Sequence, residues 1–120
     1  MDTIYIKKLR ISTIIGIYEW EQHIKQKLFI DIKFKINSIK AGKSDNISDT
    51  VDYADITNLI IQHIEIKKFK LIECVAEEVA NIILQHTASM WVQIIVYKPF
   101  AIIQAKYVSI KIERNKYNKL

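Results

Sequence analysis

The alternation of apolar and polar residues is clearest over Lys27–Asn37, where every second position is apolar. This pattern is typical of a β-strand with one dry and one wet face. The apolar positions are Leu28, Ile30, Ile32, Phe34 and Ile36. An earlier stretch, Ile4–Ile15, is rich in β-branched residues, and a shift in its apolar phase predicts a strand with a bulge. Gly16 ends this stretch, and we expect residues 17–21 to form a loop.

Helical spacing begins after Val51 and recurs in a second segment, Leu71–His86. In the first helix Asp52 is the expected N-cap. The apolar stripe of this helix consists of Ile56, Leu59, Ile60, His63 and Ile64. The stripe of the second helix consists of Ile72, Val75, Ala76, Val79, Ala80, Ile83 and Leu84. Two loops are expected, one over residues 41–46 and one that links the helices over residues 67–70.

Two further strands are predicted over Trp91–Tyr97 and Ile102–Arg114, with Pro99 between them. The order strand, strand, helix, helix, strand, strand favours an α+β fold, in which a four-stranded antiparallel sheet carries both helices on one face. We expect a single domain over residues 1–120, ending in a polar tail over residues 115–120. Open sheet edges in so short a chain favour assembly into a ring of copies.

The chain carries a net charge of +5, but its 16 lysines are spread over the whole length and only two arginines are present. Because base and phosphate recognition favours arginine, a solvated surface explains this charge better than a nucleic-acid patch. A basic nucleic-acid-binding module therefore stays a remote alternative. The single cysteine, Cys74, excludes an intrachain disulfide and fits a reducing compartment. The first residues lack the pattern of a signal peptide, so we expect a cytoplasmic protein without membrane contact.

Several motifs can be set aside. The segment Gly42-Lys43-Ser44 is like the end of a phosphate-binding loop, but the glycine that this motif needs five positions earlier is absent. The three histidines and Cys74 have no ligand-pair spacing, so we predict no metal site and no thiol chemistry. His63 lies on an apolar helix face, which favours a hydrogen-bonded structural histidine.

Four side chains are candidates for chemistry, each with a structural alternative. Glu73 lies in the first turn of the second helix, where a carboxylate is stabilised and can accept two parallel hydrogen bonds from a guanine or pterin edge. Simple charge complementarity at the helix start is its alternative. Lys98, at a strand end, is either a reactive amine or a solvated lysine. Tyr53 is a phenolic acid or a packing residue, and Glu21 is equally open.

Five segments together resemble the bacterial dihydroneopterin aldolase family over residues 1 to about 114. They are Thr13–Glu21, Gln26–Asp31, Val51–Ile56, Leu71–Ala80 and Lys98–Pro99 followed by Ala101. Each segment falls in the family's order and spacing. One departure is visible, because Phe100 stands where bacterial members commonly have glycine.

The resemblance implies a carbon–carbon lyase of folate biosynthesis. This family splits 7,8-dihydroneopterin into 6-hydroxymethyl-7,8-dihydropterin and glycolaldehyde, and it typically also epimerises the substrate at C2'. It uses no metal, Schiff base or other cofactor, since the dihydropterin ring takes the electrons. The implied fold is the tunnelling fold, in which ring tetramers stack into an octamer with sites between neighbouring subunits. A dihydroneopterin triphosphate 2'-epimerase, which shares this fold, is the main alternative.

The resemblance also implies which residues bind the pterin. Glu73 would hold the 2-amino group and N3, with the backbone of Ile72 beside it. Val51 would contribute a backbone contact from the neighbouring subunit. Tyr53 of that neighbour would lie over the side-chain hydroxyls.

For catalysis the resemblance implies Lys98 as the proton donor and acceptor, with burial and a nearby carboxylate controlling its protonation. Glu21 would bind the side-chain hydroxyls or an ordered water that relays protons. Tyr53 would assist at the same hydroxyls. These roles require groups within about 3 Å of the reacting atoms.

Overall fold

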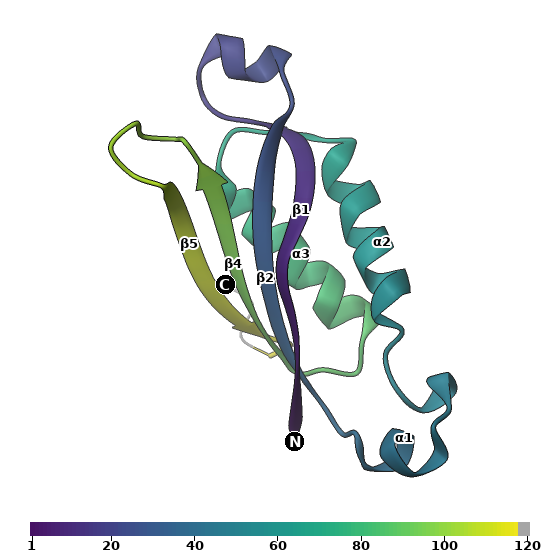
Figure 1. The fold of residues 1–120 in the computed structure, drawn as a ribbon. Helices are drawn as coiled ribbons and strands as arrows, with labels where there is room; N and C mark the ends of the chain where they lie inside the picture. Colours follow the sequence, from purple (N-terminus) through teal and green to yellow (C-terminus); the bar gives the residue numbers. More distant parts are fainter. Residues whose placement is uncertain (118–120) are drawn as a thin grey trace.

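The computed structural model describes residues 1–117 and forms one curled sheet with two long helices on one face (Figure 1). Five strands pair in the order β3-β1-β2-β4-β5. Their bounds are β1 Asp2–Ile15, β2 Gln26–Ile36, β3 Lys68–Phe69, β4 Trp91–Pro99 and β5 Tyr107–Asn115. All pairs except β1–β3 are antiparallel. The predicted α+β class is therefore confirmed.

The helices that cover the sheet are α2, Tyr53–Glu65, and α3, Ile72–His86. Their buried stripes pack on the dry face of the sheet, to which β2 contributes Leu28, Ile30, Ile32 and Phe34. Both predicted apolar stripes point inward apart from Leu59, Ile72 and His63, which are only partly covered or exposed. The alternation in the sequence thus marks the wet and dry faces of the sheet correctly, because a strand's side chains point to opposite faces in turn.

The predicted bulge in the first strand is confirmed. The register of β1 against β2 shifts between Ile6 and Leu9. At this bulge Lys8 has a φ of 57°, and its amide donates to Asp31 Oδ1 at 2.7 Å. The carboxylate thus satisfies a backbone donor that the bulge removes from the ladder.

Three local predictions are wrong. Residues 41–46 were expected to form a loop, but α1 occupies Ile39–Ser44 and ends where Asp45 takes a φ of 53° and donates its amide to Ala41 O. The expected link over residues 67–70 contains β3, which pairs with Ile14 and Ile15. The expected loop over residues 17–21 runs into a 3-10 helix, η1, Glu19–His23. Each of these elements has six residues or fewer, too short to leave a period in the sequence.

The last strand begins later than predicted. Residues 102–106 form a turn, and β5 starts at Tyr107, which pairs with Pro99. The amide of Phe100 donates to Lys106 O at 3.3 Å and closes this turn. Ile102 and Ile103 gave the turn a strand-like composition, although both side chains are exposed.

The chain end and the membrane prediction can also be compared with the structure. Of the predicted polar tail, Asn115 belongs to β5 and the amide of Lys116 donates to Met90 O at 3.1 Å, while residues 118–120 lie outside the described part of the chain. Within residues 1–117, none of the helices has the length and apolar character that crossing a membrane requires.

The molecule is elongated, with extents of 51 × 25 × 24 Å, and its two ends differ (Figure 1). One end carries η1, β3, the carboxyl end of β4 and the start of α3. The other end carries α1, the short 3-10 helix η2, Ile47–Asp49, and the start of α2. We call these the η1 end and the α1 end.

Candidate active site

At the η1 end, a glycine allows a carboxylate to lie against the backbone. Gly16 follows β1 directly and has a φ of 139°, a conformation that favours glycine. A Cβ atom at this position would lie 2.1 Å from Cδ of Glu21. Any side chain here would therefore displace Glu21, which is 5% exposed.

The carboxylate of Glu21 forms a buried ion pair with Lys98. Lys98 Nζ lies 2.7 Å from Glu21 Oε2, and the two side chains are 14% and 6% exposed. Gln26 Nε2 donates to the same oxygen at 3.0 Å, and the amide of Tyr18 donates to Oε1 at 3.4 Å. Lys98 is the second-last residue of β4, so the ion pair lies at the end of this strand.

These contacts determine the charge of Glu21. Burial is the largest influence on its pKa and acts to raise it. The hydrogen bonds from Lys98, Gln26 and the Tyr18 amide together outweigh burial and hold the pKa of Glu21 below its ordinary value. The carboxylate is therefore ionised at neutral pH. The η1 end thus holds a proton acceptor in direct contact with a proton donor.

Glu73 and Ile72 lie in the first turn of α3, at this same end. The segment before α3 is fixed to the glycine turn, because the amide of Gly16 donates to Phe69 O at 3.1 Å. The side chain of Glu73 is exposed and has no partner among residues 1–117. The N-cap residue Leu71 supplies no side-chain cap, so the first turn keeps free amides beside this carboxylate.

Val51 and Tyr53 lie at the α1 end. Asp52 between them caps α2, as predicted, with its Oδ1 accepting from the amides of Ala54 and Asp55 at 3.1 and 3.2 Å. Tyr53 is 64% exposed. Helix α2 separates it from the η1 end, and its 13 residues span roughly 20 Å. One chain therefore brings Glu21 and Lys98 into contact at the end that also carries Glu73, and it leaves Tyr53 at the other end.

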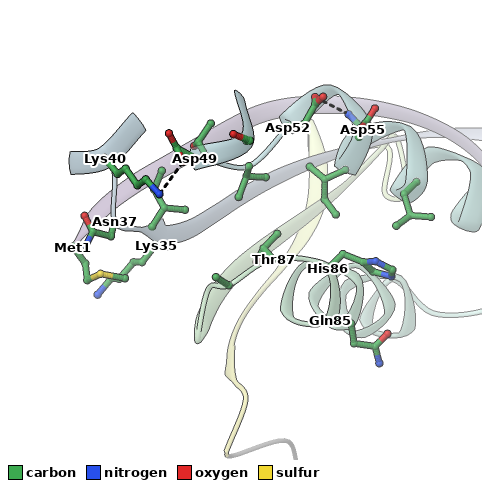
Figure 2. A pocket seen from close by; sticks show the side chains of 17 residues that line it. Met1, Lys35, Asn37, Lys40, Asp49, Asp52, Asp55, Gln85, His86 and Thr87 are labelled. Carbon is green, nitrogen blue, oxygen red and sulfur yellow. Dashed lines mark hydrogen bonds and ion pairs between the residues drawn. The ribbon is translucent and has the colours of Figure 1, made fainter. Parts of the chain in front are cut away.

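Val51 lines a cavity of about 910 Å³ at the α1 end (Figure 2). The cavity lies between the α1–η2 excursion, the start of α2 and the end of α3. An ion pair between Lys40 and Asp49, 3.3 Å apart, crosses one side, and His86 stands on the other (Figure 2). Sequence reasoning did not find this cavity, because its walls come from four separate segments.

The histidine and the cysteine that the sequence analysis excluded from metal binding and thiol chemistry, His63 and Cys74, have hydrogen-bond partners within the fold. His63 Nε2 lies 2.6 Å from Glu78 Oε1, which confirms the predicted hydrogen-bonded histidine. Lys67 contacts the same oxygen at 2.6 Å. Burial and the neighbouring Glu78 raise the pKa of the Cys74 thiol, which disfavours a reactive thiolate. Within residues 1–117, no three His, Cys, Asp or Glu side chains are grouped so that they could hold a metal ion.

A family model described as dihydroneopterin aldolase matches residues 4–113, nearly the whole described chain. The chain belongs to the dihydroneopterin aldolase family. The chain is 45% identical to the dihydroneopterin aldolase of Escherichia coli K12, over 95% of this chain and 93% of the relative. Relatives with another activity are also similar to this chain. A dihydroneopterin triphosphate 2'-epimerase of Pseudomonas aeruginosa is 33% identical over 92% of this chain and 89% of the relative.

A crystal structure of the E. coli dihydroneopterin aldolase in complex with neopterin matches the fold. The TM-score is 0.93 at 44% identity, over 96% of this chain and all of the other. This match confirms the tunnelling fold predicted from the resemblance, with the short strand β3 as an addition to the predicted four. The aldolase family and fold are therefore established together.

Proposed function

We propose that this chain is a dihydroneopterin aldolase, which cleaves 7,8-dihydroneopterin into 6-hydroxymethyl-7,8-dihydropterin and glycolaldehyde for folate biosynthesis. The buried contact of 2.7 Å between Lys98 and Glu21 carries this proposal. Membership of the aldolase family, with 45% identity to the E. coli enzyme, supports the choice of substrate. Glu73 supplies the unpaired carboxylate that a pterin edge requires.

The reaction needs one group that can both accept and donate a proton. When the bond between C1' and C2' breaks, the 2'-hydroxyl loses its proton and its oxygen becomes the aldehyde of glycolaldehyde. The electron pair of the broken bond enters the ring's C=N bond, and C1' then gains a proton to form the hydroxymethyl group. Lys98 and Glu21, in direct contact, can hold and return such a proton at Nζ.

We also propose that the reaction uses neither a metal nor a Schiff base. The ring's own C=N bond supplies the electron acceptor that a metal or an imine would otherwise provide. We expect no cofactor for the same reason.

We propose that a neighbouring copy completes the site with its Val51 and Tyr53, in an octamer of two stacked tetramer rings. The placement of these two residues at the α1 end, far from Lys98, supports this proposal. The open edge of β5 and the two-residue strand β3 at the other edge leave room for the sheet to continue into a second copy. We further propose a single domain over residues 1–120 and a cytoplasmic location, which the lone Cys74 fits.

A 2'-epimerase side activity is part of the proposal, because the cleavage is reversible. The electron pair released into the ring can form the C1'–C2' bond again on the other face of the glycolaldehyde carbonyl, whose oxygen regains its proton, and this inverts C2'. Epimerases among the relatives support it. The test is incubation of the purified chain with 7,8-dihydroneopterin and, separately, with its triphosphate, with products resolved by chromatography. We expect glycolaldehyde from the first substrate. Epimerised triphosphate without glycolaldehyde from either substrate would instead assign the chain to the epimerases.

The remote alternative, a basic nucleic-acid-binding module, has its own test. Binding to a generic DNA duplex is measured at low and at moderate salt. A lysine-rich binding face would give tight binding with a steep loss of affinity as salt rises. We expect weak binding, because the basic residues are spread over the whole chain.

A further inference from the structure

Gln22 makes two short side-chain hydrogen bonds, and the mechanism proposed above gives this residue no role. Its Nε2 donates to Gly16 O at 2.7 Å and to Phe69 O at 2.9 Å. The side chain is half-buried on η1, directly after Glu21. The two acceptors are 53 positions apart in the sequence, so this one amide group joins two distant segments.

The two acceptor residues are also joined to each other. The amide of Gly16 donates to Phe69 O at 3.1 Å, so that carbonyl accepts two hydrogen bonds and both of its lone pairs are used. Gln22 thereby closes a ring of three hydrogen bonds between the end of β1, η1 and β3. Such a ring fixes the relative position of all three elements, because each member restrains the other two.

Each side of this ring leads to one part of the proposed active site. On one side, Gly16 touches the carboxylate of Glu21, which holds Lys98. On the other side, Phe69 is three residues before Ile72, where α3 begins, and Glu73 follows. We propose that Gln22 is a positioning residue, which sets the distance between the Glu21–Lys98 pair and Glu73. The catalytic consequence rests on the function proposed above.

The amide group is required for chemical reasons. A glutamine Nε2 carries two hydrogens and can donate to two carbonyl oxygens at once, which neither a hydroxyl nor a carboxylate can do. Methionine has nearly the same length and shape and donates nothing, so Gln22→Met removes both bonds with little change in packing. Gln22→Glu places a negative charge against two carbonyl oxygens and is expected to be the more damaging change.

The experiment compares Gln22→Met with Thr13→Val, a matched control. Thr13 Oγ1 shares its single hydrogen between two nearby carbonyls, Ile64 O at 2.9 Å and Lys67 O at 3.2 Å. These bonds tie β1 to the end of α2, and neither acceptor is Gly16 or Phe69. In Gln22→Met we expect kcat to fall roughly tenfold to hundredfold, because about 1 Å of misplacement costs that much. The Kd for neopterin should change less than about threefold, because Glu73 itself is retained. Thr13→Val should keep kcat near the parent value at a similar thermal midpoint.

Two results would overturn the inference. One is a kcat in Gln22→Met that equals that of Thr13→Val once the two are compared at equal stability, which would leave Gln22 a merely structural role. The other is amide hydrogen exchange over residues 16–21 and 70–74 that is unchanged in Gln22→Met, since a lost linkage must loosen both segments. The exchange measurement needs no turnover, so it decides the inference even if the parent chain fails to cleave dihydroneopterin and the proposed function falls.

Discussion

The η1 end and the α1 end of the molecule are built in opposite ways. At the η1 end each oxygen of the Glu21 carboxylate has a partner from within the chain, and the partners come from the residue before η1, from β2 and from β4. At the α1 end Tyr53 projects from the first turn of α2 with most of its side chain exposed. The groups that we propose for proton transfer are thus organised within one chain, whereas the side chain that we propose to enclose the substrate is left exposed.

The largest expected effect is at the organised end. Lys98→Ala removes the proposed proton donor and should lower kcat about a thousandfold, within the range that general acid–base groups supply. Pterin binding, measured by fluorescence titration with neopterin, should change little because Glu73 is untouched. Lys106→Ala is the matched control, an exposed lysine in the turn after β4. A Lys98→Ala chain that keeps more than a tenth of the parent turnover would contradict the assignment of proton transfer to the η1 end.

The next effect separates binding from chemistry within the η1 end. Glu73→Ala removes the carboxylate that we propose accepts two charge-assisted hydrogen bonds from the pterin. Each such bond is worth about 1.5–3 kcal/mol, so the affinity for neopterin should fall roughly a hundredfold or more. The readout is the Kd of neopterin, with Glu113→Ala on β5 as a control carboxylate. An unchanged Kd in Glu73→Ala would remove this residue from the site.

A smaller effect concerns the stability of the organised end in acid. The pKa of Glu21 is lower in the folded chain than its ordinary value, so the unfolded chain binds more protons at acid pH. Its stabilising contribution is therefore present above the ordinary carboxyl pKa and is lost as the pH falls through the depressed one. Urea unfolding of the parent and of Glu21→Gln at several pH values below about 5 tests this. The parent should lose stability more steeply with falling pH, and parallel curves would contradict the assignment.

Much of the fold could be predicted because burial leaves a periodic trace. The strand β2 and the helices α2 and α3 repeat an apolar face for ten residues or more, and the N-cap Asp52 marks the start of α2. The elements of six residues or fewer were missed, namely α1, η1, η2 and β3. The helix α1 was mistaken for a loop because its glycine and lysines have no buried face, and the exposed Ile102 was mistaken for strand.

The site was predictable only in part. Glu73 and Lys98 stand out by position, at a helix start and at a strand end, but the resemblance to a family was needed to select them. The contact between Glu21 and Lys98 spans 77 positions, and that between Gln22 and Phe69 spans 47. No local pattern encodes such pairs, since they exist only when β4 and β3 are in place. The only sequence signal for them was Gly16, whose missing side chain makes room for Glu21.

The central claim, that one active site takes its chemistry from one copy and its Tyr53 from another, is tested most directly by complementation. Lys98→Ala and Tyr53→Ala chains are produced together with different tags, and oligomers that carry both tags are purified. Each variant alone should be nearly inactive. With random assembly of equal amounts, about a quarter of the sites pair an intact Lys98 with an intact Tyr53, so about a quarter of the parent turnover should return. Mixed oligomers no more active than either variant alone would contradict the account.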